Sequence, residues 1–116
     1  MALSLLVIGD DYDIPVTLND DGSFYNVSAA TSIKAVIASN ADDGVNYCSE
    51  VNLVSGAPGA DWANGVVVLA FTPTETKEIA DHITSPSYAK LVIKVYIGGK
   101  EYTWKESIRV HPENID

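Results

Sequence analysis

A β-hairpin is predicted by residues 87–110, whose sequence is SYAKLVIKVYIGGKEYTWKESIRV. The first arm is rich in β-branched residues and alternates at the two-residue period of a strand. Gly98-Gly99 then supplies the positive φ angles that a tight type I′ or II′ turn requires. Because two strands cannot bury an apolar face alone, further strands must cover this hairpin.

In each arm of the hairpin, one face is more apolar than the other. The first arm alternates Leu91, Ile93, Val95 and Ile97 with Lys90, Val92, Lys94 and Tyr96. The second arm alternates Tyr102, Trp104, Ile108 and Val110 with Thr103, Lys105, Ser107 and Arg109. Trp104 is therefore predicted to lie in the core. Glu106 shares the phase of Trp104 and Ile108, so either a bulge turns it outward or it faces a neighbouring chain.

Five further strands are predicted upstream of the hairpin, over residues 3–8, 12–18, 31–39, 47–53 and 65–71. Residues 24–27 form a short extended piece between the second and third of them. Pro15 cannot donate to a ladder, so its strand lies at a sheet edge or carries a bulge. The strand at 47–53 directs Tyr47 inward, with Cys48 on the alternate side, where it faces either a second core layer or solvent. The continuous apolar run Val66–Phe71 is typical of a central strand covered on both faces.

One short helix is predicted before the hairpin. Thr72-Pro73-Thr74-Glu75 matches a capping box with proline at the first helical position. Ile79 and Ile83 would then stack one turn apart over two to three turns. The pattern as a whole predicts an all-β protein, an antiparallel immunoglobulin-like β-sandwich of about seven strands, as a single domain over residues 1–116. The Cys…Trp…Cys spacing of antibody domains is absent.

Composition narrows the class of protein. The chain has a formal net charge of −9, with 16 acidic and 7 basic residues. The sequence shows no basic cluster, so binding to nucleic acid or to an anionic membrane is not expected. The single cysteine, Cys48, excludes an intramolecular disulfide and fits assembly in a reducing cytoplasm. The apolar start Met1–Ile8 lacks the basic flank and cleavage site of a signal peptide.

No catalytic arrangement can be recognised, so the protein is predicted not to be an enzyme and to need no cofactor. The acidic pairs Asp10-Asp11, Asp20-Asp21 and Asp42-Asp43 have turn contexts, and a calcium site formed by two such loops is the alternative. His82 and His111 have no further ligands at metal-binding spacing. No base is placed by the sequence to activate Cys48.

Three residues are candidates for an interface: Trp62, Glu106 and Tyr47. Trp62 lies in the predicted loop 55–64, where it either anchors a partner or caps the open end of the core. Glu106 is a candidate because it is a charged residue on the strand face that otherwise carries the apolar residues Trp104 and Ile108. Tyr47 belongs to a second hypothesis, a carbohydrate-binding or adhesin module, in which it would stack on sugar rings together with Trp62 or Tyr25.

Four segments carry a resemblance to a known family. They are DIPVTL at 13–18, DG at 21–22, YNVS at 25–28 and ATSIKA at 30–35. In this order they resemble the opening of immunoglobulin-like domains in tailed-phage virion proteins, nearest to the N-terminal domain of phage baseplate upper proteins. The apolar strand, the Thr/Pro/Glu element and the final hairpin follow in the family's order. Asn26, Ser28 and Ala29 depart from the family's Asp, Thr and Gly.

The resemblance implies a non-enzymatic structural role in a virion, in which the protein docks on other virion proteins. It allows both a monomer and a homo-oligomer. It also implies synthesis in the host cytoplasm. Family members continue into a shaft or further domains, so a lone module of this kind could instead be a capsid decoration or fibre-anchoring protein. The expected location is therefore the virion, on the capsid, the tail or the baseplate.

Overall fold

The predicted hairpin forms the centre of the larger of two packed sheets. A computed structural model describes residues 5–7, 12–20, 23–41, 44–85 and 87–111. Its strands are β1 (Leu5–Val7), β2 (Tyr12–Thr17), β3 (Asn19–Asp20), β4 (Ser23–Phe24), β5 (Ser32–Ala38), β6 (Val51–Leu53), β7 (Val66–Phe71), β8 (Ser87–Ile97) and β9 (Lys100–His111). The helical elements are α1 (Pro73–Glu78) and two 3-10 turns, η1 (Trp62–Asn64) and η2 (Ile79–Asp81).

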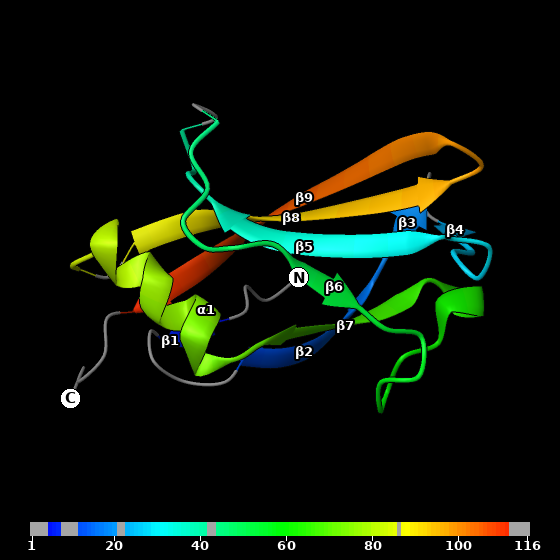
Figure 1. Ribbon diagram of the computed structural model, residues 1–116, viewed down its shortest axis with the longest axis horizontal. Helices are drawn as coiled ribbons and strands as arrows, with labels where there is room; N and C mark the ends of the chain where they lie inside the picture. The colour runs from blue at the N-terminus through cyan, green and yellow to red at the C-terminus, as the bar shows by residue number, and fades with distance from the viewer. Residues whose placement is uncertain (1–4, 8–11, 21–22, 42–43, 86, 112–116) are drawn as a thin grey trace.

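The larger sheet has the strand order β1-β9-β8-β5-β6 (Figure 1). β8 and β9 pair without interruption from Ser87 opposite Val110 to Ile97 opposite Lys100. Gly98 and Gly99 have φ angles of 59° and 80°, so both central residues of the turn are left-handed, as the type I′ geometry requires. β1 runs parallel to the end of β9. Every other pairing among the described strands is antiparallel.

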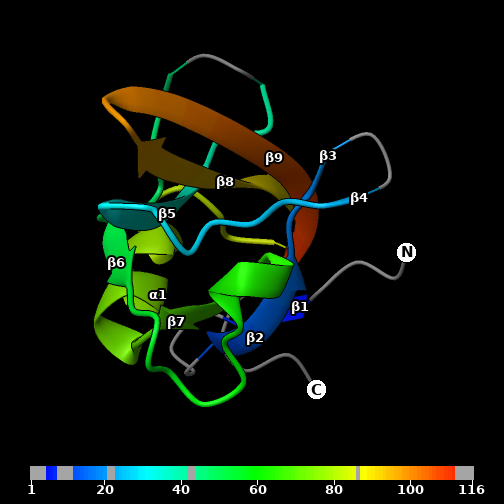
Figure 2. The same ribbon diagram turned by 90° about the vertical axis from the view of Figure 1, so that its right-hand side faces the viewer.

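β2 and β7 form the opposing sheet, which lies below the larger one in Figure 2. β2 pairs with β7 alone among the described strands, so Pro15 lies in an edge strand, as predicted. β3 and β4 form a small separate hairpin. The structure is thus the predicted all-β sandwich with one short helix. The segment Leu3–Ser4 and Ile8 of the first predicted strand lie outside the described residues.

The prediction that Val66–Phe71 is a central strand was wrong, although four of its six residues are buried, as predicted; Val66 is half-buried and Ala70 is exposed. β7 has one strand neighbour, β2, among the described residues. Val68 is nevertheless only 4% exposed. The loop before η1 lies against it, because a Cβ placed on Gly59 would approach Val68 Cγ2 to 3.8 Å. A covering loop and a covering strand produce the same apolar run in the sequence.

The strand predicted over 47–53 is also shorter than expected. Only Val51–Leu53 pairs with β5 as a strand, and Asn46 forms an isolated bridge with Ala38. The segment before Val51 bends instead of alternating as a strand, although Tyr47 packs against the core, as predicted. Cys48 is buried, whereas Tyr47 is half-buried.

The helix begins as predicted. The backbone N–H and the hydroxyl of Thr72 both donate to Glu75 Oε1 at 2.8 Å. Ile79 and Ile83 are buried and anchor η2 to the core. α1 lies at one end of the sandwich, between the two sheets (Figure 1). In the described part of the chain, no helix has the length and apolarity needed to cross a bilayer.

Candidate functional site

No described strand lies between β9 and β2 along one side of the sandwich. From Lys100 to Ile108, β9 pairs with β8 alone among the described strands, because β1 reaches only Arg109–His111. β2 likewise has β7 as its one described partner. An edge of this kind presents backbone N–H and C=O groups to which another chain can add a strand.

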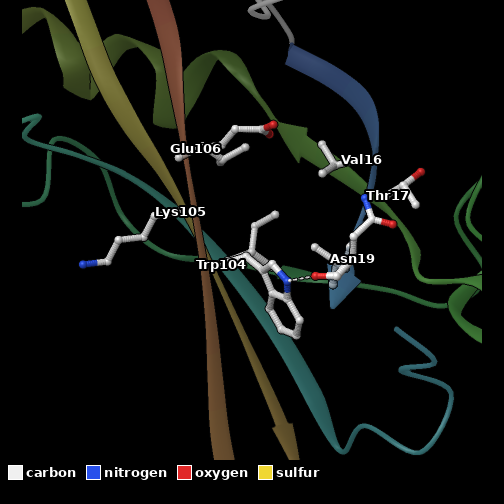
Figure 3. Close-up of a pocket in the computed structure, with 9 residues that line it drawn as sticks. Val16, Thr17, Asn19, Trp104, Lys105 and Glu106 are labelled. Atoms are coloured by element: carbon white, nitrogen blue, oxygen red, sulfur yellow. Dashed lines mark hydrogen bonds between the residues drawn. The ribbon is translucent and has the colours of Figure 1, made fainter. Parts of the chain in front are cut away.

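Glu106 lies on this side of the sandwich. The β8–β9 register is continuous, with Leu91 opposite Glu106, so no bulge turns the side chain outward. The half-buried carboxylate enters a pocket of about 160 Å³. The pocket is lined by Val16, Thr17, Leu18, Asn19, Leu91, Ile93, Trp104, Lys105 and Glu106. Figure 3 shows Glu106 and Val16 on opposite sides of the pocket, while the Lys105 side chain points away from it.

Trp104 separates this pocket from a second hollow. Its indole Nε1–H donates to the carbonyl oxygen of Asn19 at 3.0 Å, which ties β9 to β3 (Figure 3). The Tyr25 ring lies 5.2 Å from the Trp104 ring and 5.8 Å from the Tyr102 ring, in both cases tilted. These residues line a hollow of about 260 Å³ together with Asn19 and Thr103. Trp104 packs against the core, as predicted, but remains only half-buried.

We call this surface the edge site. Its members are Val16, Asn19, Tyr25, Tyr102, Trp104 and Glu106. It combines a strand edge that pairs with no second described strand, three aromatic rings and one carboxylate. Aromatic side chains beside a few polar groups are what protein interfaces use as anchors. The sequence pattern indicated the odd phase of Glu106 but not the aromatic cluster, because Tyr25 is far from Tyr102 in the chain.

Tyr47 lies elsewhere. Its ring stacks on His82, with centroids 4.6 Å apart and planes 18° apart. The two residues border a shallow hollow beside Glu78, whose carboxylate accepts hydrogen bonds from the backbone N–H and hydroxyl of Ser49, each at 3.1 Å. Cys48 lies next to it, and burial raises the pKa of its thiol to about 11. The thiol is therefore protonated at neutral pH and is not a nucleophile.

Trp62 forms part of η1 and packs against the core. Its carbonyl oxygen accepts from the backbone N–H groups of Val27 and Gly65, at 2.8 and 3.1 Å. The indole nitrogen is buried and has no hydrogen-bond partner within the described residues. This geometry favours the interpretation that Trp62 covers the end of the core. The structure does not bring Trp62, Tyr47 and Glu106 into one site.

The calcium hypothesis concerns residues that mostly lie outside the described part of the chain: Asp10, Asp11, Asp21, Asp42 and Asp43. Within the described ranges, no group of three His, Cys, Asp or Glu residues could hold a metal ion.

No family model and no curated protein matches this sequence. Among solved structures, the chain is similar to the N-terminal domain of phage TP901-1 ORF48, with a TM-score of 0.56 and 14% sequence identity. The likeness covers 97% of this chain and 86% of that one. The fold is similar to that of a phage protein's N-terminal domain. At this identity the likeness concerns the fold alone, and it extends across nearly the whole chain.

Proposed function

We propose that the protein is a bacteriophage virion structural protein, a non-enzymatic module that docks on other virion subunits. The observation that carries the proposal is the structural likeness to the N-terminal domain of phage TP901-1 ORF48 over 97% of the chain. The sequence resemblance to phage baseplate upper proteins points the same way. Because of that resemblance, we favour a baseplate or tail position over a capsid decoration or fibre anchor. We also propose that the domain is related to the immunoglobulin-like domains of phage virion proteins.

Docking would use the edge site. A partner strand added to β9 would satisfy the edge N–H and C=O groups and cover the aromatic rings of Tyr102 and Trp104. Such rings carry much of the binding energy when an interface buries them. Glu106 would set the register, because a half-buried carboxylate requires a basic or hydrogen-bonding group opposite it.

The experiment begins with particles released from the cells that encode the chain. After gradient purification, mass spectrometry should find the chain in the particle fraction, and immunogold labelling should place it on one structure. Purified Tyr102→Ala protein should then co-sediment less well than wild type. Tyr88→Ala is the control, because Tyr88 is 52% exposed and pairs with Arg109 on the other face of the sheet. A chain that is absent from particles refutes the proposal.

Oligomeric state bears on the position within the particle. Light scattering on the pure chain should find a monomer if docking requires another virion protein. A trimer or larger ring would instead favour a symmetric position such as a decoration or fibre anchor, since closed symmetry repeats one interface.

A carbohydrate-binding or adhesin module is the second candidate. The hollow lined by Tyr25, Tyr102 and Trp104 favours it, because half-buried rings can stack on a sugar. Tyr47 and Trp62 support it less, since one stacks on His82 and the other packs against the core. A glycan array should give binding that Tyr102→Ala abolishes. Silence on the array, with no quenching of tryptophan fluorescence, would dismiss this candidate.

A further inference from the structure

Two oppositely charged residues, Glu106 and Lys100, share the inner face of β9. Glu106 enters the core-side pocket, and Lys100 is paired with Ile97, which packs against the core. Neither charge has a hydrogen bond or an ion pair within the described part of the chain. The other cations of β9, Lys105 and Arg109, lie at alternate positions and therefore on the outer face. Lys100 is thus the one cation of β9 on the same face as Glu106.

The odd-numbered positions of β9 direct their backbone groups toward the sheet edge. Gly98-Gly99 is a two-residue turn, so Ile97 and Lys100 form a hydrogen-bonded pair, and the even positions of β9 bond to β8. On the far side of β8, the Tyr96 carbonyl accepts from the Thr31 N–H at 2.8 Å, as this alternation requires. An antiparallel strand added to the edge would therefore form its hydrogen-bonded pairs with the odd positions.

A second copy of β9 brings Lys100 opposite Glu106 in one register alone. When two identical antiparallel strands are related by a two-fold axis, one residue faces its own copy, and positions equally far on either side of it face each other. Lys100 and Glu106 are equally far from Thr103, which is an odd position, so pairing centred on Thr103 satisfies both the charges and the hydrogen-bond pattern. A shift of two positions sets Glu106 opposite either Tyr102 or the turn.

The same register pairs aromatic rings of the edge site. Tyr102 of each copy comes opposite Trp104 of the other, at the closely spaced positions where cross-strand side chains are nearest. Within one chain, Tyr25 packs on both rings, at 5.8 and 5.2 Å. The Trp104 indole N–H already donates to the Asn19 carbonyl at 3.0 Å, so covering the ring leaves no polar group without a partner.

We propose that the edge site binds a second copy of this chain, by antiparallel pairing of the two β9 strands about a two-fold axis at Thr103. The inference rests on the proposed function for the use of the edge site, and it names the subunit that docks there. A two-fold axis repeats each contact, so the interface holds two ion pairs and two ring pairs. On the outer face Glu101 comes opposite Lys105, so no like charges meet. Because the overlap of the strands is short, the dimer is expected to have micromolar affinity.

An inward-pointing charge on an edge strand is also a known means of preventing strand pairing. Such a charge opposes any added strand that lacks a complementary group, because the carboxylate would be buried without a partner. A copy of β9 centred on Thr103 brings Lys100 and avoids this penalty. The two interpretations differ in the sign of one effect. Glu106→Gln should strengthen self-association if Glu106 only guards the edge, and should weaken it if Glu106 binds Lys100.

The first test measures self-association of the full chain by analytical ultracentrifugation between about 2 and about 500 µM. Wild type should form dimers and no trimers. Lys100→Glu and Glu106→Lys should each weaken the dimer at least about 100-fold, because each sets like charges opposite each other twice. An equimolar mixture of these two variants should dimerise as wild type does, since both pairs are then opposite in charge. Lys77→Glu makes the same charge change on α1 and should alter Kd less than about twofold.

The second test locates the axis by disulfide cross-linking in a Cys48→Ala background. The Cα atoms of a hydrogen-bonded antiparallel pair lie about 5.5 Å apart, a separation that a disulfide spans. The exposed Thr103 faces its own copy, so Thr103→Cys should give a covalent dimer under mild oxidation. Ser107→Cys is the matched control, because Ser107 is also exposed but would lie about 27 Å along the strands from its own copy.

Four results overturn the inference: a wild-type monomer at every concentration, a tighter dimer for Glu106→Gln, no dimer in the mixture of the two folded charge variants, or equal cross-linking at positions 103 and 107. Particle association separates this inference from the proposed function. A chain that is found in particles but never dimerises overturns the inference alone. A chain that dimerises but is absent from particles refutes the proposed function alone.

Discussion

Replacing Gly65 with alanine is expected to destabilise the protein by about 3 kcal/mol. Gly65 has a φ of 78°, which costs a residue with a Cβ about 1 kcal/mol. Its new Cβ would lie 2.8 Å from the carbonyl oxygens of both Leu18 and Tyr25. The Leu18 N–H donates to the Gly65 carbonyl at 2.7 Å, and the Tyr25 N–H donates to the Leu18 carbonyl at 3.0 Å. Moving these groups apart weakens both bonds, at about 1 kcal/mol each.

Urea denaturation followed by tryptophan fluorescence measures this loss. With a slope of about 1.5 kcal/mol/M, the midpoint should fall by about 2 M while the slope stays unchanged. Gly99→Ala is the matched control, because Gly99 has a φ of 80° but a Cβ added there would meet no heavy atom of a non-adjacent residue within 4 Å. It should lose only the conformational part, about 1 kcal/mol. Equal losses in the two proteins would refute the argument from close approach.

Three further predictions concern the core, the helix cap and the thiol. Leu69→Ala should cost about 3 kcal/mol by chemical denaturation, since Leu69 is fully buried, whereas Val54→Ala, at a 61% exposed position, should stay within about 0.5 kcal/mol. Thr72→Ala removes the cap hydroxyl that donates to Glu75 and should cost about 1 kcal/mol, seen as a lower melting temperature. The pKa of Cys48 is raised from 9.0 to about 11, so the unfolded chain releases this proton first as pH rises. The free energy of unfolding should therefore be unaffected by this group below pH 9 and should fall between pH 9 and 11. Over that interval, wild type should lose more stability than Cys48→Ala, which has no thiol to titrate.

The elements predicted correctly are those that carry their own local signal. Gly98-Gly99 fixes the hairpin turn, and the Thr72…Glu75 pair fixes the helix start, without help from distant residues. Val66–Phe71 lacks such a signal, because apolarity reports burial but not whether a strand or a loop provides the cover. Strand alternation predicts a strand from Tyr47 onward, and this prediction fails because the chain bends before Val51.

In the candidate site too, features with a local sequence signal could be predicted, whereas features that depend on distant residues could not. The phase of Glu106 is visible in the sequence, since strand alternation is a local property. The edge beside it is not, because it depends on which residues of β9 the described part of β1 pairs with, namely Arg109–His111. The grouping of basic residues on the outer face of the larger sheet cannot be read from the sequence for a related reason: Lys105 and Lys90 become neighbours only when the hairpin register places Val92 opposite Lys105. Charge counted along the chain therefore misses a pattern that the sheet creates.

Glu106→Leu should separate stability from docking. A half-buried carboxylate facing Val16 and Leu91 is costly to the isolated fold, and a leucine there would bury apolar area instead. Half the burial of a leucine side chain contributes about 1 kcal/mol, so the melting temperature should rise by about 4 °C. Association with particles should weaken, because the partner group opposite the carboxylate loses its contact. Glu106→Gln keeps the shape and should weaken association without the gain in melting temperature. If the leucine variant melts at a lower temperature than wild type, the carboxylate stabilises the fold and the argument from its burial is wrong. If the variant associates with particles as wild type does, the edge site is not the docking surface.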